Sequence, residues 1–218
     1  MRTYEDSYRH KGLRRQLVEV IKSKGITDTR VLDAILHIPR HFFMDSAFDK
    51  IAYEDRAFPI AEGQTISQPY TVAYQTQLLD IRPFDKVLEI GTGSAYQASV
   101  IAEMGAQVFT IERQKKIFEA NKDFPFIKKY PGIKFFFGDG FEGLPTFAPF
   151  DKIIVTAAAP FIPPKLIEQL KPGGKLVIPV GEGKVQKMLR ISKQPDGSVM
   201  EESFDNFSFV PMMEGRNN

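Results

Sequence analysis

Glycines and carboxylates follow three short apolar runs in the second half of the chain, in an order typical of a nucleoside-binding site. Gly91-Thr92-Gly93 follows the run 86–90, so the backbone can turn tightly there and approach a ligand. Glu112 ends the next run, about 20 residues beyond Gly91, where a carboxylate can accept hydrogen bonds from both hydroxyls of a ribose. Asp139, which lies between two glycines after the third run, can accept from an adenine amino group.

Each of these signals also has an ordinary structural explanation. Glycines often only make turns, Glu112 could cap the following helix, and an aspartate such as Asp139 is common in turns. Their occurrence at three successive strand ends favours one shared pocket, because the carboxyl ends of parallel strands meet at one edge of a sheet.

The glycine turn also indicates the kind of nucleoside. A dinucleotide site needs G-x-G-x-x-G, and the position of the third glycine is Tyr96 here, which disfavours a pyrophosphate. S-adenosyl-L-methionine carries no phosphate and needs no third glycine. Glu89, just before the turn, could suit the positively charged amino-acid end of that cofactor, or it could be wholly structural.

The elements around these residues predict an α/β fold. Apolar runs predict strands over 86–90, 107–111, 134–137, 152–155 and 175–178, with helices over 95–104, 113–122 and 163–170 between them. Alternating strands and helices indicate a doubly wound, mostly parallel sheet with helices on both faces. Pro172-Gly173-Gly174 is expected to turn the chain into the fifth strand, and strands over 185–192 and 204–210 are expected to form an antiparallel edge.

The first part of the chain predicts a helical cap. Helices are expected over 8–24, from the cap residue Asp28 to the breaker Pro39, and from Pro69 to about Leu79, with an irregular segment over 44–68. We therefore expect a single domain over 1–218. In it, 1–80 form the cap and the substrate-side segment, and 81–218 form the cofactor-binding core.

The composition excludes several classes of protein. The 218 residues are 43% hydrophobic, enough for a sizeable core, and the net charge of +2 argues against a dedicated nucleic-acid binder. The absence of cysteine excludes disulfides, thiolate metal sites and cysteine nucleophiles. No signal-peptide core or membrane-spanning run is present, so a cytoplasmic protein is expected.

Several segments together resemble the protein L-isoaspartate O-methyltransferase family. The resemblance covers roughly residues 12–213, and the segment from Gln64 to Pro69 is its most specific part, whereas the glycine turn is common to many methyltransferases. The segments that carry it are Ile38–Phe43, Tyr53–Arg56, Gly63–Tyr70, Val87–Gln97, Ile154–Pro160, Leu170–Gly174, Ile178–Gly181 and Phe209–Pro211.

The resemblance implies a Rossmann-like fold and methyl transfer from S-adenosyl-L-methionine to isoaspartyl residues of damaged proteins, with S-adenosyl-L-homocysteine as product. It implies that Ser67 is the active-site serine. With the residues argued above, the candidate cofactor-binding set is Thr65, Ile66, Ser67, Glu89, Gly91, Thr92, Gly93, Glu112, Asp139 and Gly140.

The chemistry of that reaction needs alignment more than activation. The free α-carboxylate of an isoaspartyl residue has a pKa of about 3.5, so it is already ionised at pH 7. The Ser67 hydroxyl can orient it toward the methyl group and need not act as a covalent nucleophile. Ser67 could also cap the helix that starts at Pro69.

Three residues depart from the family pattern. Ala95 stands where glycine is usual, Glu62 where histidine is common, and Ser208 where an arginine often occurs. The extra methyl group of Ala95, close to the glycine turn, leaves open an alternative: a homologue that binds cofactor or peptide with little or no activity.

Other functions fit less well. An enzyme that methylates nitrogen in nucleic acid would place a polar residue and two prolines after the fourth strand, where this chain has Thr156–Pro160. A nicotinamide-dependent oxidoreductase lacks its third glycine. His37 and His41 have metal-ligand spacing, but Pro39 would break a helix between them, so no metal site is expected.

Overall fold

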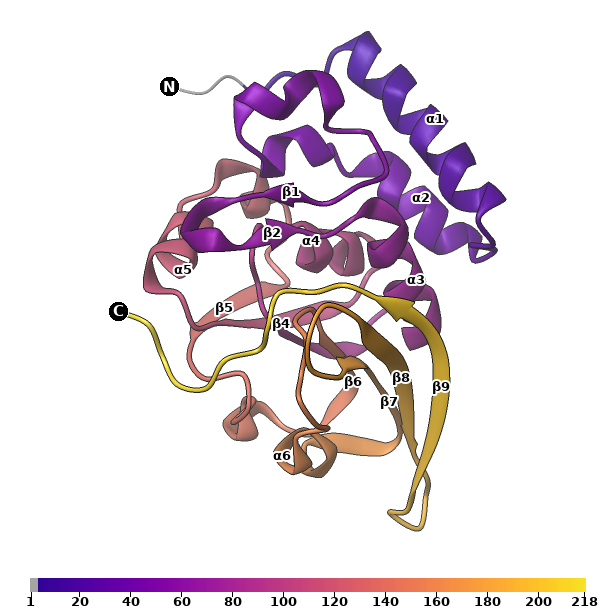
Figure 1. The fold of residues 1–218 in the computed structure, drawn as a ribbon, viewed down its shortest axis with the longest axis vertical. Helices are drawn as coiled ribbons and strands as arrows, with labels where there is room; N and C mark the ends of the chain where they lie inside the picture. Colours follow the sequence, from indigo (N-terminus) through magenta and orange to yellow (C-terminus); the bar gives the residue numbers. More distant parts are fainter. Residues whose placement is uncertain (1–3) are drawn as a thin grey trace.

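A seven-stranded sheet runs through the computed structural model, which describes residues 4–218 (Figure 1). Its first five strands are parallel and its last two are antiparallel, which confirms the predicted doubly wound sheet with an antiparallel edge. In spatial order the strands are β5 (Ile133–Phe137), β4 (Gln107–Glu112), β3 (Lys86–Ile90), β6 (Phe150–Val155), β7 (Leu170–Val180), β8 (Gln186–Lys193) and β9 (Val199–Phe207).

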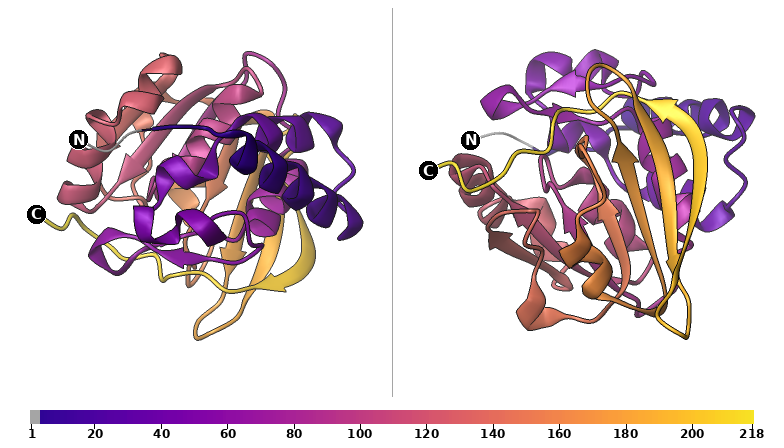
Figure 2. Two further views of the ribbon diagram at one scale, coloured as in Figure 1. Left: turned by 90° about the horizontal axis from the view of Figure 1, so that it is seen from above. Right: turned by 60° about the horizontal axis from the view of Figure 1, so that its bottom comes forward.

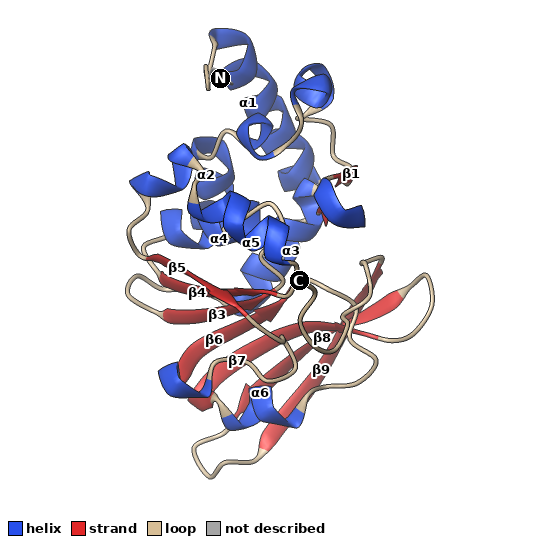
Figure 3. Ribbon diagram, turned by 90° about the vertical axis from the view of Figure 1, so that its left-hand side faces the viewer, coloured by secondary structure: helices blue, strands red, loops and turns tan. Residues whose placement is uncertain are grey.

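Helices cover both faces of this sheet, but unequally. Figure 3 shows α1 to α5 on one side and the short α6 on the other. The helices are α1 (Tyr8–Ser23), α2 (Thr29–His37), α3 (Pro69–Leu79), α4 (Tyr96–Glu103), α5 (Lys115–Lys122) and α6 (Pro164–Glu168). The 3₁₀ turn η4 (Pro125–Lys129) precedes β5, and the 3₁₀ turn η5 (Pro145–Phe147) lies between β5 and β6.

The central strands are buried on both faces, so two apolar clusters form. Side chains of successive strand residues point to opposite faces. Val87 and Val108 accordingly pack in the cluster under α1 to α4, whereas Leu88 and Phe109 pack in the cluster on the other face, with α6. This explains why the strands read as nearly continuous apolar runs in the sequence.

The helical cap follows the sequence signals closely. Asp28 caps α2 by accepting from the Arg30 backbone N–H at 2.9 Å, and Pro69 occupies the first position of α3. The segment expected to be irregular contains more structure than predicted. It holds the 3₁₀ turns η2 (Ser46–Ile51) and η3 (Ala61–Gly63), and a two-stranded ribbon of β1 (Phe58–Pro59) and β2 (Thr65–Ile66); a further 3₁₀ turn, η1 (Arg40–Phe43), precedes it.

Two strand boundaries were wrong. Pro172-Gly173-Gly174 lies inside β7, not before it, because a bulge opposite Phe150 lets β7 begin at Leu170. The last strand runs over 199–207 instead of 204–210. Among the described residues it pairs only with β8, so it is an edge strand. Its exposed acidic residues interrupt the apolar alternation by which a buried strand is recognised in a sequence.

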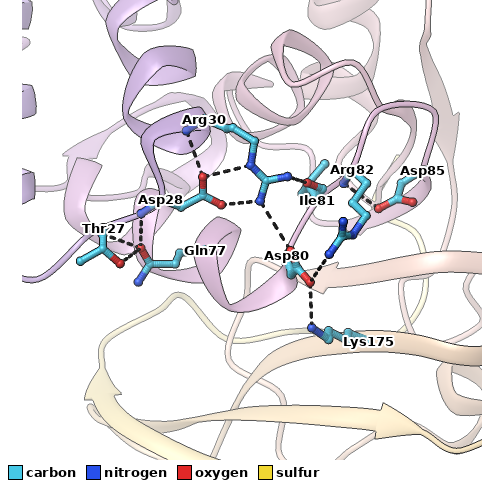
Figure 4. Close-up of polar contacts among 9 residues, drawn as sticks. All are labelled: Thr27, Asp28, Arg30, Gln77, Asp80, Ile81, Arg82, Asp85 and Lys175. Atoms are coloured by element: carbon cyan, nitrogen blue, oxygen red, sulfur yellow. Dashed lines mark hydrogen bonds and ion pairs between the residues drawn. The ribbon is translucent and has the colours of Figure 1, made fainter.

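An ion-pair network ties the cap to the sheet, as Figure 4 shows. Asp80 at the end of α3 has the left-handed backbone conformation, with φ of 53°. Its carboxylate accepts from Lys175 of β7 at 3.2 Å and pairs with Arg30 of α2 at 3.5 Å and with Arg82 at 3.6 Å. Partial burial acts to raise the pKa of Asp80, but the hydrogen bond from Lys175 and the charges of Lys175, Lys152 and Arg82 lower it below its ordinary value.

We expect Asp80→Asn to lower the free energy of unfolding by about 1 kcal/mol at low salt, since the network is largely exposed. Asparagine tolerates the left-handed conformation, so the change removes charge without adding backbone strain. Urea unfolding at low and high salt measures it, and Glu201→Gln, which removes an exposed charge of β9, is the control. A loss that is the same at 1 M salt, where screening is strong, would contradict this explanation.

Candidate active site

A cavity opens where the carboxyl ends of β3, β4 and β6 meet, which we call the strand-end cavity. It is lined by the glycine turn, residues 64–67, the ends of β4 and β6, and residues 210–213. The chain order of the strands reverses at this place, because β4 lies on one side of β3 and β6 on the other. Such switch points are the usual ligand sites of open parallel sheets.

The glycine turn forms the floor of the strand-end cavity. Gly91 and Gly93 have φ of 94° and 51°, and the Gly91 and Thr92 N–H groups both donate to the Ile111 carbonyl. A Cβ atom on Gly91 would lie 2.7 Å from the Thr156 hydroxyl oxygen, so only glycine fits against β6. The tight turn and its close approach to Thr156 therefore already require these glycines, as predicted for a tight turn.

Glu112 joins the glycine turn to the start of α5. One carboxylate oxygen accepts from the Gly93 N–H at 3.0 Å and the other from the Gln114 N–H at 2.9 Å. Each oxygen keeps a further lone pair, and the side chain lines the strand-end cavity. Asn121 of α5 holds the same turn by donating to the Gly93 carbonyl at 2.8 Å.

Glu89 lies behind the glycine turn and does not line the strand-end cavity. It is fully buried on the helix-covered face of β3, and among residues 4–218 neither carboxylate oxygen has a hydrogen-bond partner. Burial raises its pKa to about 8; the nearby Thr110 hydroxyl opposes this shift, and the Glu112 carboxylate adds to it. An acid held in this state gains by meeting a cation, because a buried charge is costly unless it is paired.

Asp139 and Gly140 lie at the end of β5 and differ in their access to the strand-end cavity. Gly140 lines it and leaves no room for a side chain, since a Cβ atom there would lie 2.4 Å from Ile90 Cγ2. Asp139 accepts from the Phe141 N–H at 2.9 Å and from the Gly215 N–H at 2.7 Å. Its adenine contact stays a prediction, and each oxygen could accept one more hydrogen bond.

Thr65, Ile66 and Ser67 form another wall, on and just after β2. The ribbon lies against the glycine turn, because a Cβ atom on Gly93 would be 4.0 Å from the Thr65 carbonyl oxygen. The Ser67 hydroxyl has no hydrogen-bond partner among the described residues. Ser67 does not cap α3, which was the alternative role considered for it. Asp55 does so instead, because its carboxylate accepts from the Tyr70 N–H at 2.8 Å.

A second hollow, which we call the outer groove, adjoins the strand-end cavity. Its volume is about 980 Å³, and the two share Thr65, Ser67, Thr156 and Val210 as lining residues. Aromatic side chains line its far part, where the rings of Tyr70 and Phe207 stack at 6.3 Å. The shared wall thus separates two adjoining hollows, of which the outer groove could hold an extended chain.

Some lining residues were not predicted from the sequence. Residues 210–213, after β9, cross the strand-end cavity, and Gln114 and Gln97 also line it. The resemblance at Phe209–Pro211 pointed to this region without assigning it a role. Ala95, by contrast, is buried with φ of 64° and is not a lining residue, so the structure gives its extra methyl group no contact with the strand-end cavity.

The histidines have structural partners. His37 is exposed and pairs with Glu103 at 3.5 Å, whereas His41 is buried and bonds the Tyr53 hydroxyl at 2.7 Å and the Glu5 carbonyl at 3.1 Å. His10, His41 and Asp6 lie close enough to hold a metal. However, Asp6 is already bound in a two-bond pair to Arg14, whose positive charge opposes a metal ion there.

Comparisons with known proteins show the family to which this chain belongs. The family described as Protein-L-isoaspartate(D-aspartate) O-methyltransferase (PCMT) matches residues 12–217. A protein-L-isoaspartate O-methyltransferase of Cytophaga hutchinsonii is 56% identical over 209 residues, covering 96% of this chain and 94% of the relative. The one from Flavobacterium johnsoniae is 53% identical over 214 residues, covering 98% of this chain and all of the relative.

Solved structures share the fold. A protein-L-isoaspartate O-methyltransferase superposes with a TM-score of 0.82 at 28% identity, over 91% of this chain and 65% of that longer chain. A Plasmodium falciparum structure, described as a candidate member in complex with S-adenosyl-L-homocysteine, gives 0.79 at 26% identity over 92% of this chain and 98% of that chain. Sequence and fold thus agree that this chain belongs to the protein-L-isoaspartate(D-aspartate) O-methyltransferase family.

Proposed function

We propose that this protein transfers a methyl group from S-adenosyl-L-methionine to the free α-carboxylate of L-isoaspartyl residues in damaged proteins and peptides. The observation that carries the proposal is the wall of Thr65 and Ser67, which faces both the strand-end cavity and the outer groove. A cofactor on one side and a peptide on the other would meet at this wall. The cytoplasmic location expected from the sequence stays a prediction.

The residues of the strand-end cavity fit a cationic nucleoside cofactor. Glu112 has spare lone pairs for ribose hydroxyls, and the unpartnered Glu89 carboxyl lies behind the turn that would hold the amino-acid end. Glu112 in the lining and Glu89 behind it suit a ligand whose sulfonium and ammonium groups are positive. The lining cation Arg113 donates its hydrogen bonds to the carbonyl groups of Glu214 and Gly215. When bound, the cofactor supplies an electrophilic methyl group, and the chain's own groups hold and orient the partners.

Ser67 would orient the acceptor. An isoaspartyl α-carboxylate is ionised at neutral pH, so the site needs no base to create the nucleophile. The Ser67 hydroxyl is free to donate a hydrogen bond to one carboxylate oxygen and direct the other toward the methyl group. Fixing this alignment lowers the barrier by removing the entropy cost of bringing the two reactants into line.

The outer groove would hold the peptide on either side of the isoaspartyl residue. Its polar lining residues include Gln68 and Asn206, and its aromatic wall offers apolar contact. Extended peptides bind such surfaces through main-chain hydrogen bonds, which tolerate many sequences. This tolerance suits an enzyme whose substrates share only the damaged residue.

Ser67→Ala should reduce kcat for an isoaspartyl peptide by about 10²-fold, the typical effect of losing one oriented donor. The assay counts base-labile methyl ester formed from labelled cofactor on an isoaspartyl peptide and on its normal aspartyl counterpart. Ser23→Ala, on the exposed end of α1, is the control and should retain full activity. Equal labelling of both peptides, or unchanged kcat in Ser67→Ala, would contradict the proposed reaction or the proposed role.

Glu89→Gln tests the buried acid. Because the pKa of Glu89 is about 8 in the folded protein and 4.5 in an unfolded chain, Glu89 makes the protein less stable as pH rises between these two values. Unfolding by urea should therefore show the variant gaining stability over the wild type from pH 5 to pH 8. If the ionised acid meets the cofactor's ammonium, wild-type affinity should rise over the same window relative to the variant.

Calorimetry in buffers of different ionisation enthalpy gives the protons released on binding. Release of a proton by the wild type near pH 7, with no such release by Glu89→Gln, supports the amino-end role. Identical pH profiles of affinity in the two proteins would leave Glu89 as a purely structural acid.

A further inference from the structure

The C-terminal segment Pro211–Asn217, which we call the strap, crosses the strand-end cavity after β9. Figures 1 and 2 show it running from the end of β9 past the ends of the parallel strands toward α5. Met212 and Met213 line the cavity, and the Met212 N–H donates to the Ala158 carbonyl at 2.7 Å. The strap therefore begins beside β6 and closes one side of the cofactor site.

The far half of the strap is held at the corner between β4 and α5. Arg113 donates from Nε to the Gly215 carbonyl at 3.2 Å and from Nη2 to the Glu214 carbonyl at 3.4 Å. A charged donor makes stronger hydrogen bonds than a neutral one. The Arg113 side chain is thus the ionised group that fixes this part of the strap.

The backbone of the same corner adds a short parallel bridge. The Lys115 N–H donates to the Asn217 carbonyl at 2.9 Å, and the Asn217 N–H donates to the Arg113 carbonyl at 2.8 Å. The Asn217 amide also donates to Gln114 Oε1 at 2.6 Å. Hydrogen bonds, more than apolar burial, therefore hold the strap beyond Met213, whose side chain is itself 54% exposed.

This corner also carries the residue predicted to bind the ribose. Glu112 precedes Arg113 directly and accepts from the Gln114 N–H, while Gln114 accepts from Asn217 of the strap. A third tie joins the strap to Asp139, predicted to bind adenine, through the Gly215 N–H. The strap is thus bonded to the immediate neighbours of one predicted cofactor ligand and directly to another.

We propose that Arg113 is a positioning residue that holds the strap over the strand-end cavity and thereby slows dissociation of the cofactor and its product. A segment with few buried apolar contacts and exposed hydrogen bonds opens locally at low free-energy cost. Opening of the strap gives the bound nucleoside a route out, and the two Arg113 bonds make the opening rarer. The inference concerns cofactor retention and does not depend on which acceptor is methylated.

The test is the dissociation rate of S-adenosyl-L-homocysteine, followed by stopped-flow displacement. Arg113→Ala should raise this rate about fivefold, the scale of losing exposed hydrogen bonds to a charged donor. KM for the cofactor should rise while kcat is maintained or increases. Lys128→Ala, which removes an exposed cation of η4 away from the strap, is the control and should match the wild type.

A truncated chain that ends at Met213 tests the mechanism. It keeps Arg113 and removes the carbonyl groups that Arg113 holds, so it should also speed dissociation. Arg113→Ala in the truncated chain should add nothing further, because both changes break the same contact. Arg113→Lys, which can reach one carbonyl, should lie between the wild type and Arg113→Ala.

Two results would overturn the proposal. One is a dissociation rate in Arg113→Ala equal to that of Lys128→Ala. The other is a full additive effect of Arg113→Ala in the truncated chain, which would mean that Arg113 acts elsewhere. Urea unfolding of every variant separates a local effect from a general loss of stability, since a destabilised fold would move both readouts together.

Discussion

The carboxylate of Glu112 holds together the segments that enclose the active site. It bonds the glycine turn through the Gly93 N–H and the start of α5 through the Gln114 N–H. These two segments come from different βα units, and the parallel sheet brings them to one edge. Asn121 of α5 adds a second link to the turn by donating to the Gly93 carbonyl, so the cofactor site depends on the register of β3 against β4.

Burial gives the site its second constraint. Glu89 lies under the glycine turn without a hydrogen-bond partner in the described part of the chain, and its pKa of about 8 records the cost of ionising it there. A buried acid with a shifted pKa is typical of a functional site, where a ligand can offset the cost of ionising it. The same low-dielectric interior would strengthen any attraction between this acid and a cationic cofactor.

The substrate side is built by different means. The ribbon of β1 and β2 has little sheet structure of its own and depends on Asp55, which caps α3 and receives hydrogen bonds from Gln68 and Lys24. Because Asp55 caps the helix, the neighbouring Ser67 hydroxyl remains free. A short segment with little regular structure can therefore present a free serine hydroxyl between two hollows.

The sequence by itself determined the order of strands and helices and the positions of the glycine turn, Glu112 and Gly140, because apolar periodicity and glycine at strand ends are local signals. It misplaced the start of β7 and both ends of β9, where a bulge and an edge position weaken those signals. Only the tertiary structure decided that Glu89 is buried behind the turn and that Asp55 caps α3. It also decided that Arg113 holds a segment about 100 residues further along the chain, as sequence separation does not set which distant segments meet.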